Sequence, residues 1–220
     1  MLRSASLLAL AASAAVAFAT HESALALFLA AGALLLGAAT LLDSGPDTAK
    51  EVAIIATLAA AAAAGRVLLA PVPDVQPVTD IAVISGAALG LRAGLGVGMT
   101  AAFVSNFFLG QGLYTPWQML AWGMCGAVGA LVAPFVRRRV ALAVICLLLG
   151  YAYGFVLDVW NWYAFFPHTW PSFAARQASG FPFNTAHALG NAALALVAGP
   201  ELRRMLDRYA KRLRTVVVWA

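Results

Sequence analysis

Runs of about 20 apolar residues with few charges recur along most of this 220-residue chain. Hydrophobic residues make up 63% of the sequence and charged residues 10%, whereas soluble globular proteins are about 45–50% apolar and about 25% charged. A water-soluble fold cannot cover this much apolar surface, but a bilayer accepts it, and a helix of ~20 apolar residues crosses one. The sequence therefore predicts an all-α integral membrane protein that crosses the membrane six or more times.

The apolar runs mark the predicted helices. Runs 7–19 and 23–42 predict an N-terminal helical hairpin, although the first run also resembles a signal peptide with a small-residue cleavage site. Run 78–91 is shorter than the ~17 residues of a full span, which predicts a tilted or partial helix inside the bundle. The basic, amphipathic segment 201–214 suits the membrane surface or a partner protein. The remaining runs are 52–70, 93–109, 117–136, 140–157 and 183–198.

The basic residues give the predicted orientation. If helix 52–70 starts in the cytoplasm, only Arg66 and Arg176 lie toward the outside, and the cytoplasmic side holds the remaining 12 of the 14 basic residues. Lys and Arg collect in cytoplasmic loops, so this topology is strongly favoured over its reverse. The residues predicted to be cytoplasmic are Arg3, Lys50, Arg92, Arg137, Arg138, Arg139, Arg203, Arg204, Arg208, Lys211, Arg212 and Arg214.

Several functions are disfavoured. The net charge of +5 follows from the basic cytoplasmic loops, so we predict no nucleic-acid partner. Cys125 and Cys146 lie in apolar runs and are interpreted as packing residues, with no disulfide and no metal site. The chain has no phosphate-binding loop and no metalloprotease or serine-hydrolase motif. We therefore predict a protein that is not an enzyme and carries no cofactor.

Amide side chains gather where helix 93–109 is joined to helix 117–136. Asn106, Gln111 and Gln118 flank this turn, and Thr115 and Pro116 are typical of a helix start. Amides both donate and accept hydrogen bonds, so the cluster suits a neutral, polar ligand of many atoms. The alternative is a capped turn beside an interfacial tryptophan belt.

The predicted outer loop 158–182 is rich in aromatic residues. A loop of this length in a compact bundle is often a lid or a binding element, although its aromatic residues also suit the lipid headgroup level. In the last span Asn184, His187 and Asn191 share one helix face, which predicts a polar stripe lining the bundle.

Small residues predict close helix packing. Gly86, Gly90, Gly94 and Gly98 recur every four residues, which favours packing within the chain. A second set, Ala56, Ala60 and Ala64, forms an alanine face suited to docking against another helix, either of this chain or of another subunit.

Several of these segments together resemble the substrate-binding (S) components of energy-coupling-factor (ECF) vitamin transporters, and look most like the branch associated with cobalamin uptake. The resemblance covers roughly residues 50–200 and is most specific over 106–119. It rests on the alanine face with Arg66 and on the segments 73–79, 90–94, 105–112 and 115–119.

The resemblance implies a six-helix S-component bundle at 46–200, preceded by the extra hairpin at 1–45 and followed by the basic tail 201–220. It implies a pocket on the outer face of a prokaryotic cell membrane, and docking through Ala56, Ala60 and Ala64 onto a scaffold subunit that works with two ATPases. The predicted ligand is a vitamin, with cobalamin or a related corrinoid as the first choice. The predicted substrate-binding residues are Gln76, Asn106, Gln111, Tyr114, Trp117, Gln118, Trp160, Asn161, Trp162, His168, Asn184 and His187.

Two other classes of protein also fit the sequence. A membrane enzyme or assembly factor acting on lipid would need ionisable residues clustered at one interface, for which Asp74, Asp80, Asp158 and His168 are the candidates. A structural accessory subunit is the third possibility.

Overall fold

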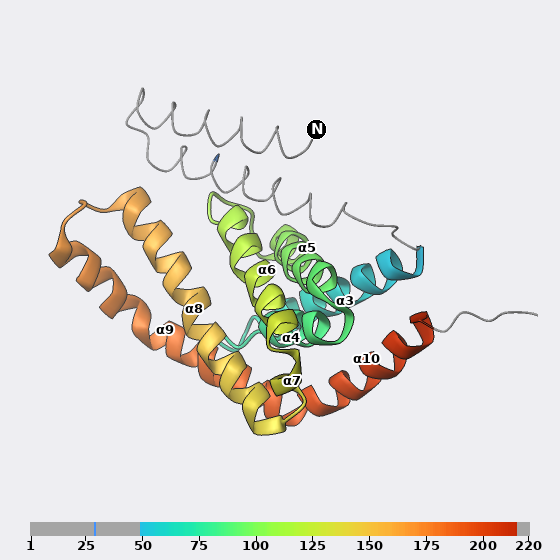
Figure 1. The fold of residues 1–220 in the computed structure, drawn as a ribbon. Helices are drawn as coiled ribbons and strands as arrows, with labels where there is room; N and C mark the ends of the chain where they lie inside the picture. The colour runs from blue at the N-terminus through green and yellow to red at the C-terminus, as the bar shows by residue number, and fades with distance from the viewer. Residues whose placement is uncertain (1–28, 30–48, 215–220) are drawn as a thin grey trace, which may run out of the picture.

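The computed structural model describes residue 29 and residues 49–214, and within these residues it contains helices and turns but no strand (Figure 1). The all-α prediction is therefore confirmed for this part of the chain, whereas the predicted hairpin at 1–45 lies outside the described residues apart from Leu29. The helices are α3 (Ala49–Leu68), α4 (Val78–Leu89), α5 (Leu91–Leu109), α6 (Thr115–Leu131), α7 (Ala133–Val136), α8 (Arg139–Phe165), α9 (Trp170–Val197) and α10 (Gly199–Arg214).

Helices α4, α5 and α6 pack with their backbones in direct contact; they are called the trio below. A Cβ atom added to Gly86 or Gly94 would collide with the backbone of Gly126, and one added to Gly98 would collide with the backbone of Trp122. The predicted packing role is thus confirmed for Gly86, Gly94 and Gly98. Gly90 differs: its φ of 101° makes the turn between α4 and α5, and no atom lies within 4 Å of the Cβ position.

The short helix predicted at 78–91 is present as α4, which has 12 residues and is buried along most of its length. At 1.5 Å per residue it is about 18 Å long, well short of the ~30 Å hydrocarbon core. It therefore lies inside the bundle as a partial helix.

Helices α8 and α9 form a long antiparallel hairpin beside the trio (Figure 1). The predicted outer loop 158–182 is wrong, because α8 continues to Phe165, α9 begins at Trp170, and the connection is only 166–169. Thr169 caps α9 by accepting a hydrogen bond from the Ser172 backbone N–H. Pro171 occupies the first turn, where a missing N–H costs nothing, and α9 continues through Pro182.

Helix α3 packs against α5 through one face only. Leu58, Ala59, Ala62 and Ala63 are buried there. By contrast Ala56, Ala60 and Ala64 are exposed, so the alanine face does not pack inside the described part of the chain.

Two of the described helices, α3 over Lys50–Leu68 and α8 over Arg139–Phe165, are long and apolar enough to cross a membrane. This length and composition give limited support for association with a membrane.

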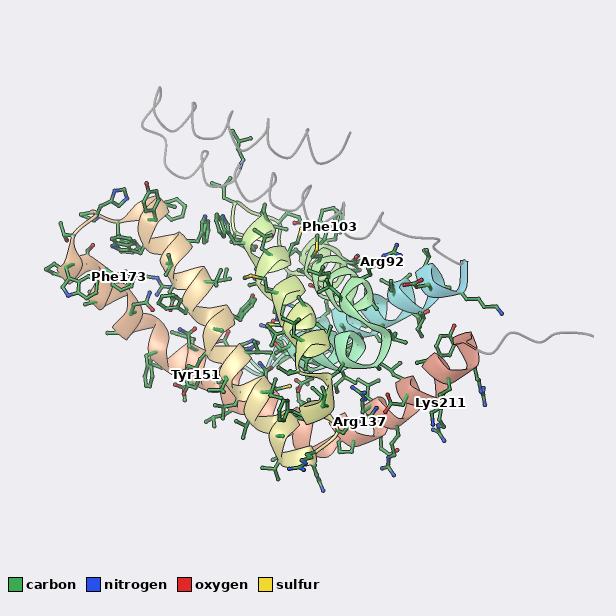
Figure 2. All side chains as sticks on the ribbon, in the orientation of Figure 1. Arg92, Phe103, Arg137, Tyr151, Phe173 and Lys211 are labelled. Atoms are coloured by element: carbon green, nitrogen blue, oxygen red, sulfur yellow. The ribbon has the colours of Figure 1, made fainter. Side chains whose placement is uncertain are left out.

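The helices end at two chemically different places. The ends of α3, α5 and α6 that carry the loops 69–77 and 110–114 are called the amide end. The opposite end, with the turns around residues 90 and 137 and with α10, is called the basic end; Figure 2 shows Arg137 and Lys211 there. Helix α10 packs onto α4, and its Leu206 is fully buried. The amphipathic segment thus docks on its own bundle.

Candidate functional site

The amide end is organised around the buried side chain of Arg66, near the end of α3. Its Nε donates to Oε1 of Gln76 at 2.9 Å, and its Nη1 donates to Oγ of Ser105 and Oδ1 of Asn106, both at 2.6 Å. Asn106 then donates through Nδ2 to Oε1 of Gln118 at 2.8 Å. One arginine therefore joins the loop before α4 to α5 and, through Asn106, to α6.

Thr115 extends this network to the turn between α5 and α6. It accepts a hydrogen bond from Asn106 Nδ2 at 3.1 Å and donates to Oε1 of Gln111 at 2.9 Å. The predicted helix start is one residue late, since Tyr114 is the cap of α6 and Thr115 is its first residue. Gln111 also donates to the carbonyl of Phe103 at 3.0 Å, which fixes the turn. The structure thus brings together four of the predicted residues: Gln76, Asn106, Gln111 and Gln118.

Aromatic residues continue the network toward α8 and α9. The guanidinium carbon of Arg66 lies 4.8 Å from the ring centre of Trp122, and Trp122 stacks on Tyr153 with ring centres 4.3 Å apart. The Trp122 indole N–H donates to Oγ1 of Thr79 at 3.2 Å, and Thr79 lies 3.5 Å from Nε2 of His187. His187 Nδ1 donates to the carbonyl oxygen of Asp74 at 2.8 Å, which leaves Nε2 to accept from Thr79. The polar core therefore reaches α3, α4, α5, α6, α8 and α9.

Sequence reasoning did not assign Arg66 to the site. Its 6% exposure and its wholly neutral partners show a buried cation with no carboxylate partner among the described residues. The available signal was its position, because it is one of only two basic residues placed on the outer side by the charge pattern. Ser105, Thr79, Trp122 and Tyr153 were also missed, since a single serine, threonine or aromatic residue in an apolar run is usually a packing residue.

A cleft of about 370 Å³ lies between α6 and α8, beside the amide end. Its wall contains two of the predicted residues, Trp117 and Trp160, and Trp160 is 7% exposed. The indole N–H groups of both are buried and have no hydrogen-bond partner. Buried donors are normally paired, so these two indoles are exceptions, but they lie beneath the cleft surface, which is almost entirely apolar. The other lining residues are Met124, Phe155, Val156, Val159 and Tyr163.

Tyr114 connects the cleft with the polar network. Its ring meets Trp160 edge to face at 6.4 Å, and its hydroxyl donates to the carbonyl of Gly110 at 2.6 Å. Asn161 follows Trp160 on α8 and is partly exposed.

Three predicted site residues instead hold the α8–α9 hairpin together. Trp162 donates to Oγ of Ser172 at 2.8 Å, and His168 stacks on Tyr163 with ring centres 4.5 Å apart. Asn184 donates to Asp158 at 2.7 Å. Asp158 also forms an ion pair with Arg176 at 2.5 Å, and its own side chain is 5% exposed. Trp162, His168 and Asn184 therefore belong to the hairpin and not to the amide network.

The loop before α4 carries an unusual backbone at Asp74. Its φ of 58° is left-handed, a conformation that aspartate and asparagine tolerate better than most residues. This geometry directs its carbonyl oxygen to His187. Partial burial raises the pKa of the Asp74 carboxyl above its ordinary value of 3.8.

Asp80 and Asn191 are buried where the trio meets the hairpin. Asp80 is 5% exposed and interacts with the thiols of Cys125 on α6 and Cys146 on α8, of which the Cys146 thiol is near enough to hydrogen-bond, while neither carboxyl oxygen has a partner in good hydrogen-bond geometry. Asn191 is fully buried against Gly150, one turn from Cys146 on α8, and its amide is also unpaired. Among the described residues no group of three His, Cys, Asp or Glu side chains is arranged to hold a metal ion.

The fold and these contacts define an all-helical bundle with a buried polar network and an aromatic cleft at one end. The chain belongs to a family of unknown function, DUF6580, whose model matches residues 46–204. No curated protein and no solved structure matches the chain.

Proposed function

We propose that this protein is a multi-pass membrane protein of the prokaryotic cell membrane, with its basic end in the cytoplasm and its amide end outside. Two described helices are long and apolar enough to span a bilayer, and Arg137, Arg138, Arg139 and the arginines of α10 gather at one end. Cytoplasmic surfaces collect Lys and Arg, which supports this orientation. In this proposal the six-helix unit is α3, α4, α5, α6, α8 and α9.

The proposed function is that of the substrate-binding subunit of an ECF-type importer, which captures a vitamin outside the cell. The cleft between α6 and α8 carries this proposal, because it joins an apolar aromatic wall to the unpaired indole N–H groups of Trp117 and Trp160. Sites for small organic ligands are mostly apolar, with a few polar groups that fix orientation. This wall suits a flat, largely apolar ligand, and an acceptor on that ligand reaches the two indole N–H groups when the side chains around them rearrange.

The volume of the cleft separates the candidate vitamins into those that fit it as it stands and those that are too large. A volume of about 370 Å³ is near the lower limit of about 300–1,000 Å³ for small-molecule sites. A single-ring or two-ring vitamin enters such a space directly. Cobalamin or a related corrinoid, the first choice from the sequence, requires the α8–α9 hairpin to move away from the trio.

The exposed alanine face supports the partner assignment. Ala56, Ala60 and Ala64 lie in solvent or lipid on α3, while the opposite face of the same helix is buried. A helix face made of small side chains allows close approach of another membrane helix. We expect the scaffold subunit to bind there, and ATP hydrolysis to occur in two separate ATPase subunits.

The test is ligand binding by the full-length protein, purified in detergent from cells grown with cobalamin. Its visible spectrum is recorded first, and a panel of vitamins including cobalamin is then titrated by calorimetry. Trp117→Phe and Trp160→Phe keep the ring but remove the donor, and one neutral hydrogen bond corresponds to a loss of about threefold to tenfold in affinity. Trp170→Phe is the matched control, because Trp170 is 77% exposed on the hairpin.

The proposal is supported if one vitamin binds stoichiometrically and the two cleft variants weaken it while the control does not. Absence of corrin colour with binding of a smaller vitamin would reject cobalamin and keep the importer. Failure of the whole panel on a folded protein would reject the importer and favour a lipid substrate.

A further inference from the structure

A second cavity, of about 670 Å³, lies at the basic end between α10 and the corner where α7 meets α8. Its rim carries five basic residues and one acidic residue: Arg137, Arg139, Arg203, Arg204, Lys211 and Asp207. Figure 2 shows Arg137 at the turn after α7 and Lys211 farther along α10. The rim therefore has an excess of positive charge, which attracts an anion.

Arg203 lines this cavity and carries an unpaired donor. Its side chain is 7% exposed, and its Nε is paired with Asp207 at 3.0 Å. Its Nη1 is buried and has no hydrogen-bond partner. A buried guanidinium donor is costly to leave unpaired, so the site is complete only when an oxygen acceptor lies beside it.

The floor and the surroundings of the cavity are apolar. Ala88, Val136 and Leu142 line its inner wall. Phe135 and Val140, the chain neighbours of the lining residues Val136 and Arg139, are 62% and 69% exposed, and Leu131 at the end of α6 is 78% exposed. Exposed apolar side chains therefore occur on α6, α7 and α8 close in the chain to the basic rim. Inorganic phosphate gains nothing from contact with exposed apolar side chains, whereas the acyl chain of a lipid packs against them.

We infer that this cavity binds the headgroup of an anionic phospholipid of the cytoplasmic leaflet, with the phosphate beside Arg203 and Arg137 and an acyl chain along Phe135 and Val140. Basic pockets on the cytoplasmic side of membrane helices are suited to such headgroups. The inference rests on the membrane orientation proposed above. Because α10 supplies Arg203 and packs on α4, a bound lipid would hold α10 in place.

The test uses full-length protein in a neutral detergent, without vitamin. Phosphatidylglycerol, phosphatidylcholine and inorganic phosphate are titrated separately, with thermal stability and native mass spectrometry as readouts. Wild-type protein is expected to retain one phosphatidylglycerol and to prefer it over phosphatidylcholine. Arg203→Met is expected to weaken that binding about fivefold or more, the effect of one basic residue at an anionic membrane surface.

Arg208→Met is the matched control, because Arg208 is exposed on the same helix and does not line the cavity. If Arg203→Met fails to fold, Arg137→Gln tests the same rim from an exposed position. Equal binding of phosphatidylglycerol and phosphatidylcholine, equal loss in Arg208→Met, or saturation by inorganic phosphate at the same concentration would overturn the inference. Vitamin titration of Arg203→Met separates this result from the proposed transport function, since that variant is expected to bind vitamin normally.

Discussion

The trio α4–α6 and the hairpin α8–α9 are both antiparallel helix assemblies, but they are held together differently. In the trio the contacts are between backbones, as where Gly94 meets Gly126. Toward the amide end of the hairpin, Gly154 and Gly180 instead face the side chains of Asn184 and Asp158. Farther along the hairpin, Gly150 meets the Ala188 backbone, so backbone contact there is confined to one part of the helix pair. Side chains can change rotamer and backbones cannot, so the trio tolerates added volume less well than the part of the hairpin around Gly154 does.

The largest difference in stability between the two assemblies is expected when one methyl group is added to a glycine in each. Gly94→Ala would place Cβ against the Gly126 backbone and within 2.8 Å of the Gly86 Cα, so the helices must separate. We expect a loss of ~3 kcal/mol or more, at the upper end of overpacking costs. Gly154→Ala meets only the Asn184 side chain and should cost ~1 kcal/mol. Thermal unfolding in detergent measures both, and equal losses would refute the distinction.

The second prediction concerns Arg66, whose hydrogen bonds join α3 to α5 and to the loop before α4. Arg66→Met leaves the oxygens of Gln76, Ser105 and Asn106 without their donor. Unsatisfied buried groups cost ~1–3 kcal/mol each, so with partial relaxation we expect a loss of ~2–3 kcal/mol. Hydrogen exchange should increase at the ends of α5 and α6 and change little in the hairpin tip.

Arg66→Lys is the control for the role of charge. Lysine keeps the positive charge but lacks the planar fork that reaches three oxygens at once. We expect Arg66→Lys to remain close to Arg66→Met in stability. Full recovery by lysine would mean that charge, and not geometry, is what the network requires.

The third prediction concerns the loss of a polar contact within the hairpin, the ion pair between Asp158 and Arg176. Asp158→Asn removes the ion pair with Arg176 but keeps a polar group beside Asn184. Because Arg176 is 23% exposed, we expect the variant to lose ~1–2 kcal/mol of folding stability. This value lies between those for surface and buried ion pairs. Hydrogen exchange should rise in 158–184 alone. Increased exchange in the trio would show that the two assemblies are not separable.

The positions of several helices could be predicted from the sequence, because α3, α5 and α8 each coincide with a long apolar run. It failed at 158–182, where aromatic residues and Pro167, Pro171 and Pro182 are typical of a loop. The helices persist there because Asp158 pairs with Arg176 and Trp162 pairs with Ser172. These are contacts between helices, and no local pattern shows them.

In the candidate site, too, residues close together in the sequence could be predicted, whereas contacts between distant segments could not. The amides Asn106 and Gln118 were predicted because they lie close together in the sequence around one turn. Arg66 was not assigned, because its partners Ser105 and Asn106 are far along the chain. The unpaired indole N–H groups of Trp117 and Trp160 depend on the packing of α6 against α8, so a sequence identifies the residues but not the cleft.

The smallest expected effect is at Asp74, whose loop connects the trio to the hairpin through His187. Burial raises the pKa of the Asp74 carboxyl above 3.8, so the folded protein holds this proton to a higher pH than the unfolded chain does. The stability contributed by Asp74 is therefore greatest at low pH and falls as the pH rises through the folded-state pKa. Solvent screening limits the change to below ~1 kcal/mol.

Asp74→Asn removes this titration while keeping a residue that tolerates the φ of 58°. The difference in melting temperature between Asp74→Asn and wild type should therefore grow in favour of the variant as the pH rises from 4 to 7. Other carboxylates titrate in both proteins and cancel in the difference. A difference independent of pH would show that Asp74 acts only through its backbone carbonyl, and the link between trio and hairpin would then be insensitive to pH at this loop.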